Sequence, residues 1–235
     1  MVDCNKNEEN DCIICSRRSA MFSMLSDAEI QLIKDNRVNV HFNAGEVIQK
    51  QGAFMSHVIS VNAGLVKVYL EAEGKNQSNT ILRLVKPTNF IGGPGIYYDQ
   101  LHHYTVSAVN DSSICFIDLL VFKTILDQNK VFAAAFMKDF SEKVISVYNR
   151  LLSLTKKQAV GRMAYTLLYI FEEVYEKKEP ILCLSRQDLS DLSEISRDSS
   201  LKILREFEKE GLIRMTDCDL ELLKPETLRM IRLKG

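Results

Sequence analysis

The first half of the chain alternates short apolar segments with glycine. Seven of the ten glycines lie between residues 45 and 95. Within residues 57–70 the side chains alternate with a period near two, which is typical of strands. Short strands separated by glycine turns predict an antiparallel β-roll or barrel. A short helix precedes it, because Ser26 and Glu29 form a capping-box pattern. The predicted strands cover residues 38–42, 46–51, 57–70, 79–85, 103–109 and 113–118.

From about residue 129 the apolar positions follow a helical pattern instead. No glycine or proline occurs between Gly95 and Gly161, and apolar residues then recur at alternating steps of four and three. This a/d heptad is sustained for about four heptads, enough for a coiled-coil seam. A helix lying on the core of its own domain is the alternative, but the 3.5-residue period favours a homodimer. The predicted seam residues are Met137, Phe140, Val144, Val147, Leu151 and Leu154.

The last third of the chain predicts three helices and a small hairpin. One helix lies between Gly161 and Pro180, a helical pair follows, and residues 212–223 form two short strands around a polar turn. This order is that of a winged helix-turn-helix. The expected fold is therefore α+β, with a cysteine-containing leader over 1–20, a β-roll over 21–128, a dimerisation helix over 129–158 and a winged helix-turn-helix over 159–235.

The helical pair carries the most informative motif, SRQDLSDLSEISRDSSLKILREFEKEGLI, residues 185–213. Ser185 and Ser196 are suitable N-caps for its two helices. The first turn and a half of the second helix should expose Arg197, Asp198, Ser200 and Lys202, whereas Leu201, Leu204 and Phe207 should be buried.

A recognition helix meets base edges with this N-terminal end. Arg197 suits guanine, and Asp198 can accept a hydrogen bond from the amino group of cytosine. Phosphate contacts, which position the protein without reading sequence, are expected from Arg186, Ser196, Ser199 and Lys202. An ordinary helical hairpin is the alternative. Glu194 stands where a small turn residue is common, and residues 156–235 contain 15 basic and 15 acidic side chains.

Charge and composition limit the partners. The chain has 30 basic and 31 acidic residues, so nucleic acid must be bound by a local patch rather than by the overall field. A signal sequence and an 18-residue apolar stretch are both missing, which predicts a cytoplasmic protein without a membrane segment. In a reducing compartment, clustered cysteines favour metal or redox chemistry over disulfides.

The order of β-roll, long helix and winged helix, together with the motif at 185–213, resembles the CRP/FNR family of bacterial transcription regulators. The resemblance implies a homodimer that binds double-stranded promoter DNA, and RNA polymerase if it activates. Asp198 and Lys202 replace the family's usual Glu and Arg, so the usual half-site does not carry over. An enzyme is not expected, because neither a nucleophile–base pair nor a phosphate loop is visible.

The resemblance also bears on the signal. Members that bind cyclic nucleotides carry a Glu for the ribose and an Arg-Ser pair for the phosphate. Here Gly93 occupies the Glu position and Tyr104-Thr105 lie roughly at Arg-Ser. A phosphate would lose its charge-assisted partner, so cAMP is not the expected ligand.

The cysteines resemble instead those of the oxygen-sensing fumarate–nitrate reduction branch, which hold an iron–sulfur cluster. The corresponding ligands would be Cys4, Cys12, Cys15 and Cys115, enough for a 4Fe–4S cluster that responds to oxygen, nitric oxide or redox state. The spacing departs from that branch, since Cys4 lies upstream of the CxxC pair rather than after it. Zinc on the same thiols, a packing role for Cys115, and a small organic ligand or haem in the roll remain alternatives. Haem would use His41, His57, His102 or His103.

Overall fold

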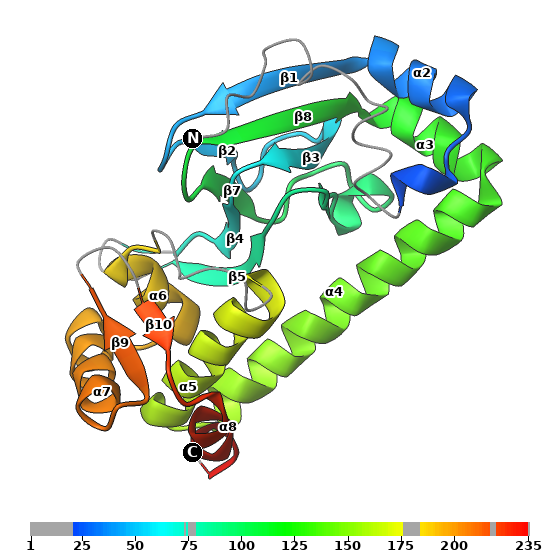
Figure 1. The fold of residues 1–235 in the computed structure, drawn as a ribbon. Coiled ribbons are helices and arrows are strands. Elements are labelled where there is room, and N and C mark those ends of the chain that lie inside the picture. Colours follow the sequence, from blue (N-terminus) through cyan, green and yellow to red (C-terminus); the bar gives the residue numbers. More distant parts are fainter. Residues whose placement is uncertain (1–20, 73, 75–78, 176–183, 217–219, 235) are drawn as a thin grey trace. The chain divides into compact units, whose positions relative to one another are not determined.

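The computed structural model describes residues 21–72, 74, 79–175, 184–216 and 220–234. Its described residues form two compact units, one drawn from the ranges 21–67 and 85–144 and the other from the ranges 68–84 and 145–234. One long helix, α4 (Lys130–Lys156), is continuous through the boundary at Val144 (Figure 1).

The first unit is built on antiparallel strands. One sheet has the order β1-β8-β3-β6, formed by β1 (Arg37–Phe42), β8 (Ser112–Asp118), β3 (His57–Ala63) and β6 (Phe90–Ile91). Elsewhere in this unit β2 (Val47–Gln49) pairs with β7 (Thr105–Ala108). Gly64 follows β3 with φ +86°, and a Cβ atom there would lie 2.3 Å from Ser112 Oγ. The turn after β3 therefore requires glycine.

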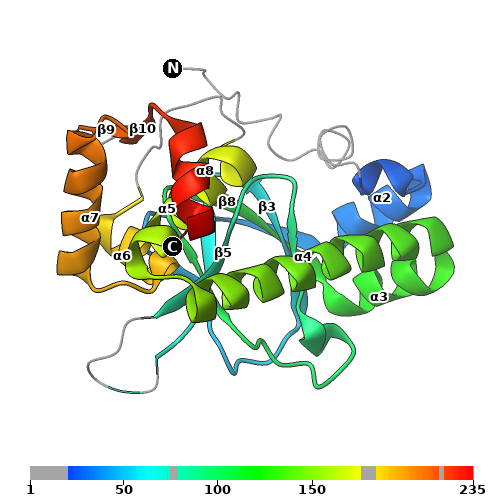
Figure 2. The same cartoon turned by 90° about the horizontal axis from the view of Figure 1, so that it is seen from below.

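Helices close one end of this unit. They are the 3₁₀ turn η1 (Phe22–Met24), α2 (Asp27–Asp35), α3 (Leu119–Gln128) and the first half of α4; a second 3₁₀ turn, η2 (Pro94–Ile96), follows β6. Figure 2 shows α2 and α3 beside the first turns of α4. Phe122 is fully buried, with its ring centroid 5.8 Å from those of Phe90 and Phe132 and 5.3 Å from that of Phe136. This aromatic cluster joins strand, α3 and α4 into one core.

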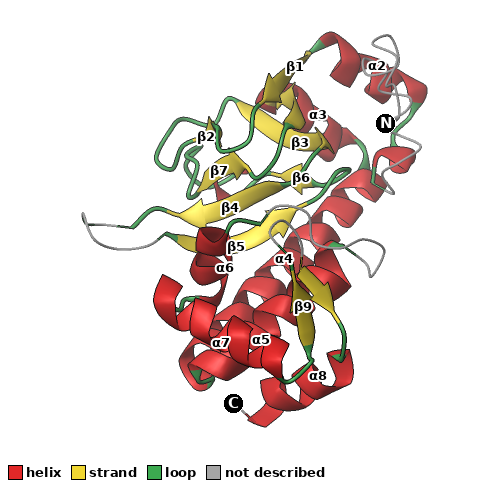
Figure 3. Cartoon of the chain, turned by 60° about the vertical axis from the view of Figure 1, so that its left-hand side comes forward, coloured by secondary structure: helices red, strands yellow, loops and turns green. Residues whose placement is uncertain are grey.

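The second unit contains β4 (Val66–Leu70, from Val68 onward), β5 (Thr80–Val85, up to Leu84) and the C-terminal elements. These are α5 (Ala159–Tyr169), a π-helical turn η3 (Ile170–Val174), α6 (Arg186–Ser193), α7 (Arg197–Lys209), β9 (Ile213–Met215), β10 (Leu220–Leu222) and α8 (Pro225–Lys234). Helix α5 is central, contacting α6, α7 and α8 (Figure 3). It buries Met163, Ala164, Leu167 and Leu168 completely, which explains its apolar sequence.

The predicted α+β architecture is confirmed, including the capping box of Ser26 and Glu29 and the hairpin β9–β10. Among the strands and α-helices, the short strand β6, α3 and the terminal helix α8 were not predicted. Pro225 at the first helical position is a signal that would have indicated α8. Strand β3 also departs from simple alternation, because residues 58–61 are buried on both faces. Among the described residues, no helix is long and apolar enough to span a bilayer.

Candidate functional site

The pair α6 and α7 is defined by its caps. Ser185 Oγ accepts a hydrogen bond from Asp188 N at 3.0 Å, and Asp188 Oδ2 accepts one from Ser185 N at 3.2 Å, which completes the predicted capping box. Ser196 Oγ accepts from Ser199 N at 3.4 Å at the start of α7. The inner face of α7 buries Ile203, Leu204 and Phe207, so its opposite face is directed to solvent.

The polar residues predicted to meet DNA are all solvent-exposed, on α7, at its N-cap or at the start of α6: Arg186, Ser196, Arg197, Asp198, Ser199 and Lys202. Two expectations were wrong. Ser200 is buried, 2% exposed, because it lies on the inner face of α7. Leu201 is half-buried rather than buried, since it lies at the edge of the outer face.

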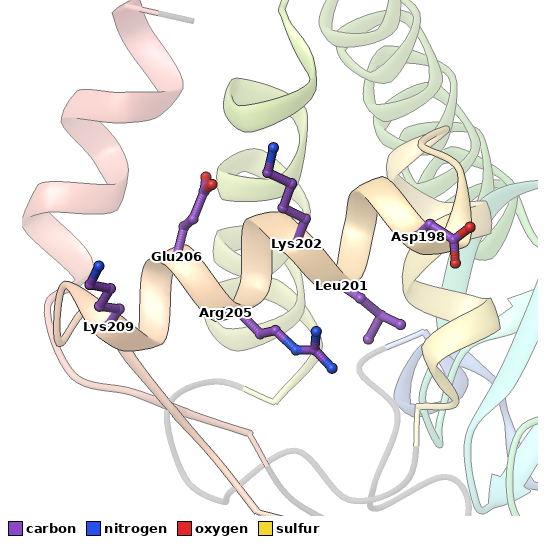
Figure 4. Close-up of a pocket in the computed structure, with 6 residues that line it drawn as sticks. All are labelled: Asp198, Leu201, Lys202, Arg205, Glu206 and Lys209. Carbon is purple, nitrogen blue, oxygen red and sulfur yellow. The ribbon is translucent and has the colours of Figure 1, made fainter.

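The outer face extends further than the motif indicated. A shallow hollow on α7 is lined by Asp198, Leu201, Lys202, Arg205, Glu206 and Lys209 (Figure 4). Arg205 and Lys209 are exposed and lie three and seven residues beyond Lys202, a spacing that keeps them near one face of a helix. The three basic side chains outnumber the two acidic ones, so the hollow has a small positive excess.

The turn between the helices contains a non-glycine residue in a left-handed conformation. Glu194 has φ 51° and ψ 46°, and such a backbone costs a residue with a Cβ about 1–2 kcal/mol. Glycine would adopt the same angles without this cost. A small residue is therefore common at this turn position, and Glu194 is unusual there. Two residues after this turn, Ser196 caps α7 through its hydroxyl group.

The predicted dimer seam on α4 is partly exposed. Of its residues, Met137, Val147 and Leu151 are exposed, while Phe140, Val144 and Leu154 are half-buried. The helix exposes further large apolar side chains that the heptad did not include, namely Ile145, Tyr148 and Leu152 at 57%, 61% and 57%. Exposed apolar residues at this density on one helix favour contact with a partner.

Of the four predicted cluster ligands, Cys4, Cys12 and Cys15 lie outside the described residues. Cys115 is 5% exposed in β8 and belongs to the core cluster that includes Phe22 and Phe90. Within the described part of the chain, no group of three or more His, Cys, Asp or Glu residues is placed to hold a metal. Cys115 lies in an apolar core that the strands share with η1, α2, α3 and the first half of α4.

The predicted haem ligands occupy different environments. His41 is exposed, His57 and His103 are half-buried, and His102 is 3% exposed. Burial, with a smaller effect of His103, lowers the pKa of His102 to about 4. Its Nδ1 atom is buried, with no hydrogen-bond partner among the residues that the structure describes.

At two positions where the family would bind a cyclic nucleotide, this chain is packed against neighbouring residues. A Cβ atom on Gly93 would lie 2.9 Å from the Tyr104 hydroxyl and 3.2 Å from its ring. The tyrosine therefore packs directly over the backbone where the family's ribose-binding Glu would begin. Thr105 is fully buried, and its Oγ1 accepts a hydrogen bond from Gln51 N at 2.9 Å.

A β-roll, a long helix with exposed apolar residues and a winged helix-turn-helix with a polar outer face define a class, the DNA-binding regulators with a sensory β-roll. Comparison with known proteins agrees. Residues 39–129 match the family model of the cyclic nucleotide-binding domain, and residues 161–231 match that of the Crp-like helix-turn-helix domain. The chain belongs to the CRP/FNR family of transcription regulators, and its relatives are regulators rather than enzymes.

The relatives are distant. The nitrogen fixation regulation protein FixK of Bradyrhizobium diazoefficiens is 22% identical over 230 residues, which are 96% of this chain and 94% of the relative. The electron transport regulator A of Shewanella oneidensis is 24% identical over 175 residues, 73% of this chain and 69% of the relative. The solved structure of FixK2 from Bradyrhizobium japonicum has a TM-score of 0.73 at 15% identity, covering 83% of this chain and 96% of that one.

Proposed function

We propose that the protein is a dimeric, sequence-specific DNA-binding regulator in the cytoplasm, which inserts the N-terminal end of α7 into the major groove. The observation that carries this proposal is the division of α7 into a buried apolar face and an exposed polar face that begins at a capped N-terminus. Recognition helices use this arrangement, with base contacts from the first turns.

Each exposed residue then has a role. Arg197 can donate two hydrogen bonds to O6 and N7 of guanine, and Asp198 can accept one from cytosine. Lys202, Arg186, Ser196 and Ser199 are suited to phosphate oxygens. Arg205 and Lys209, further along α7, extend the phosphate-contacting set.

The dimer would form through α4, with the exposed apolar residues of the second copy covering Ile145, Tyr148 and Leu152 as well as the predicted seam. Because the overall charge is near zero, the dimer would double the small local positive excess that one copy of α7 provides. Contact with RNA polymerase would follow if the protein activates transcription.

DNA binding is tested by anisotropy titration of the dimer with a site selected from a random-sequence pool, at low and moderate salt. Arg197→Ala should weaken binding to the selected site by about 10- to 100-fold and relax the preference at one base pair. Arg214→Ala, an exposed residue on the β9–β10 hairpin, is the control. Equal weakening on selected and mixed-sequence DNA would contradict the base-reading role of Arg197.

The signal that we propose is oxygen, nitric oxide or redox state rather than cAMP. Cys4, Cys12 and Cys15 precede the described chain, which starts at Met21, and Phe22 packs in the same core cluster as Cys115. The described chain thus begins beside the core that contains the proposed fourth ligand. Two relatives, FixK and electron transport regulator A, bear names that refer to nitrogen fixation and electron transport.

Four thiolates are the ligand set that a 4Fe–4S cluster uses, whereas a buried Cys115 also suits simple packing. Anaerobic purification with iron, sulfide and zinc assays and an absorption spectrum distinguishes these. We expect iron and sulfide in the wild-type protein and their loss in Cys115→Ser. Iron retained by Cys115→Ser would refute Cys115 as the fourth ligand, and zinc without sulfide would favour the zinc alternative.

A second candidate signal is a haem or a small organic ligand in the roll. It is favoured by the buried Nδ1 atom of His102, which has no partner in the described residues. The same absorption spectrum tests it, since a haem-binding protein would show a Soret band that His102→Gln removes.

A further inference from the structure

The carbonyl groups around the turn at Glu194 are held by two arginines from other helices. Helix α6 ends at Ser193, and the last four carbonyls of a helix have no partner within it. Ser190 O accepts from the backbone N–H of Glu194 and of Ile195. The following four carbonyls, of residues 191 to 194, each accept a hydrogen bond from a guanidinium group.

Arg150, from α4, reaches the first two of these carbonyls. Its Nη2 donates to Leu192 O and, at 3.4 Å, to Asp191 O. The side chain is 6% exposed, and burial lowers the pKa of Arg150 from its usual value. Buried cations are retained where hydrogen bonds offset their desolvation, and here the acceptors are the negative end of the α6 dipole.

Arg162, from α5, reaches the other two carbonyls. Its Nε donates to Ser193 O at 3.0 Å and its Nη2 to Glu194 O at 3.1 Å. Its Nη1 donates to Lys157 O at 3.0 Å, which fixes the guanidinium to the segment between α4 and α5. The two arginines thus bind the turn to two separate helices.

This arrangement accounts for a turn without glycine. We propose that Arg150 and Arg162 are positioning residues for the recognition helix: they hold the left-handed turn at Glu194 and thereby fix where α7 begins. Arg197, the first residue of α7, lies three residues after Glu194, so a displaced turn displaces the base-contacting end. Because Arg150 belongs to α4, the recognition helix is linked to the same helix that exposes Tyr148, Leu151 and Leu152.

The direct test is amide hydrogen exchange of the full-length protein without DNA. In Arg150→Met the amides of Glu194 and Ile195 should exchange about 10- to 100-fold faster, because charge-assisted hydrogen bonds to the turn are lost. The amide of Leu167, in the core of α5, should be unchanged. Arg150→Lys keeps the charge but not the fork geometry, and should give a smaller acceleration at the same two amides. Arg214→Met, remote from the turn in sequence and exposed, is the matched control.

Rescue separates positioning from general stability. Adding Glu194→Gly to Arg150→Met should slow exchange at Ile195 again, because glycine adopts the left-handed conformation without strain. Unchanged exchange at Glu194 and Ile195 in Arg150→Met would overturn the proposal. Faster hydrogen exchange that extends equally to Leu167 and is not rescued by Glu194→Gly would also overturn it. If Arg150→Met does not fold, Arg150→Lys provides the same comparison.

The consequence for DNA rests on the proposed function. Arg150→Met should lower the ratio of affinities for the selected site and for mixed-sequence DNA by about tenfold, while leaving mixed-sequence binding intact. If the wild-type protein binds no DNA, the proposed function fails, and hydrogen exchange still decides whether the arginines position the turn. Loss of affinity on both DNAs alike would contradict a positioning role for Arg150.

Discussion

Acidification should destabilise the β-roll through one buried histidine, His102. Its side chain is 3% exposed, and its backbone is fixed by hydrogen bonds, from His102 N to Ala53 O and from Gly52 N to His102 O. The pKa of His102 falls from 6.5 to about 4, chiefly because burial disfavours the imidazolium. Between these two values the unfolded chain binds a proton that the folded chain does not, so the free energy of unfolding falls as the pH falls.

The size of the effect follows from the two pKa values. At pH 7.5 His102 is neutral in both states and contributes almost no pH dependence. At pH 5, which is about 1.5 units below the pKa of the unfolded histidine, the unfolded side chain is protonated while the folded one is still mainly neutral. The free energy of unfolding is then about 2 kcal/mol lower than at pH 7.5. The loss continues until the pH reaches about 4, where the folded histidine also takes up a proton.

The assay is urea unfolding followed by circular dichroism at several pH values between 7.5 and 5, with NMR titration of the imidazole resonances. His102→Gln, which has no titrating group, should lose about 2 kcal/mol less than wild type across this range. His41→Gln is the control, because that side chain is exposed on β1 and does not contribute to the lowered pKa of His102. Parallel pH profiles of wild type and His102→Gln, or an imidazole titrating near 6.5, would refute the reasoning.

Two further predictions concern α4 and α7. Leu152→Asp places a charge among the exposed apolar residues of α4 and should convert a dimer to a monomer in sedimentation velocity. The control is Lys138→Asp, at an exposed polar position, which should remain a dimer. A dimer that survives Leu152→Asp would exclude this face of α4 as the interface. Ser196→Ala removes the side-chain cap of α7 and should destabilise the C-terminal unit by about 0.5–2 kcal/mol in urea unfolding. Ser196→Asp retains a capping oxygen and should restore most of that loss, so equal destabilisation by both variants argues against capping.

The pairing of Tyr104 with Gly93 changes how the nucleotide-binding resemblance is understood. The sequence indicated which polar groups were missing, but the structure adds that the space over Gly93 is occupied by the tyrosine ring. Introducing Glu at position 93 alone would therefore bring its Cβ atom within 2.9 Å of the Tyr104 hydroxyl, so the tyrosine has to move. Replacing Tyr104 with the family's Arg removes this ring at the same time.

Local patterns determined most of the architecture. Glycine turns and β-branched segments defined the strands, the heptad defined α4, and Ser26, Ser185 and Ser196 marked the helix starts, because capping and periodicity depend on residues close together in sequence. Most of the exposed residues at the start of α7 were predicted for the same reason, since the face of a helix follows from its period, but Ser200 was assigned to the wrong face.

Contacts between distant segments were decided by the tertiary structure. No local pattern places Arg150 against carbonyls that lie more than forty residues away, buries His102 or lays Tyr104 over Gly93. Likewise, which apolar residues of α4 stay exposed depends on how the rest of the chain covers the helix, so Ile145, Tyr148 and Leu152 were missed by a heptad register alone. Sequence periodicity sets the face that a residue occupies along its own helix or strand, and packing between elements sets what that face meets.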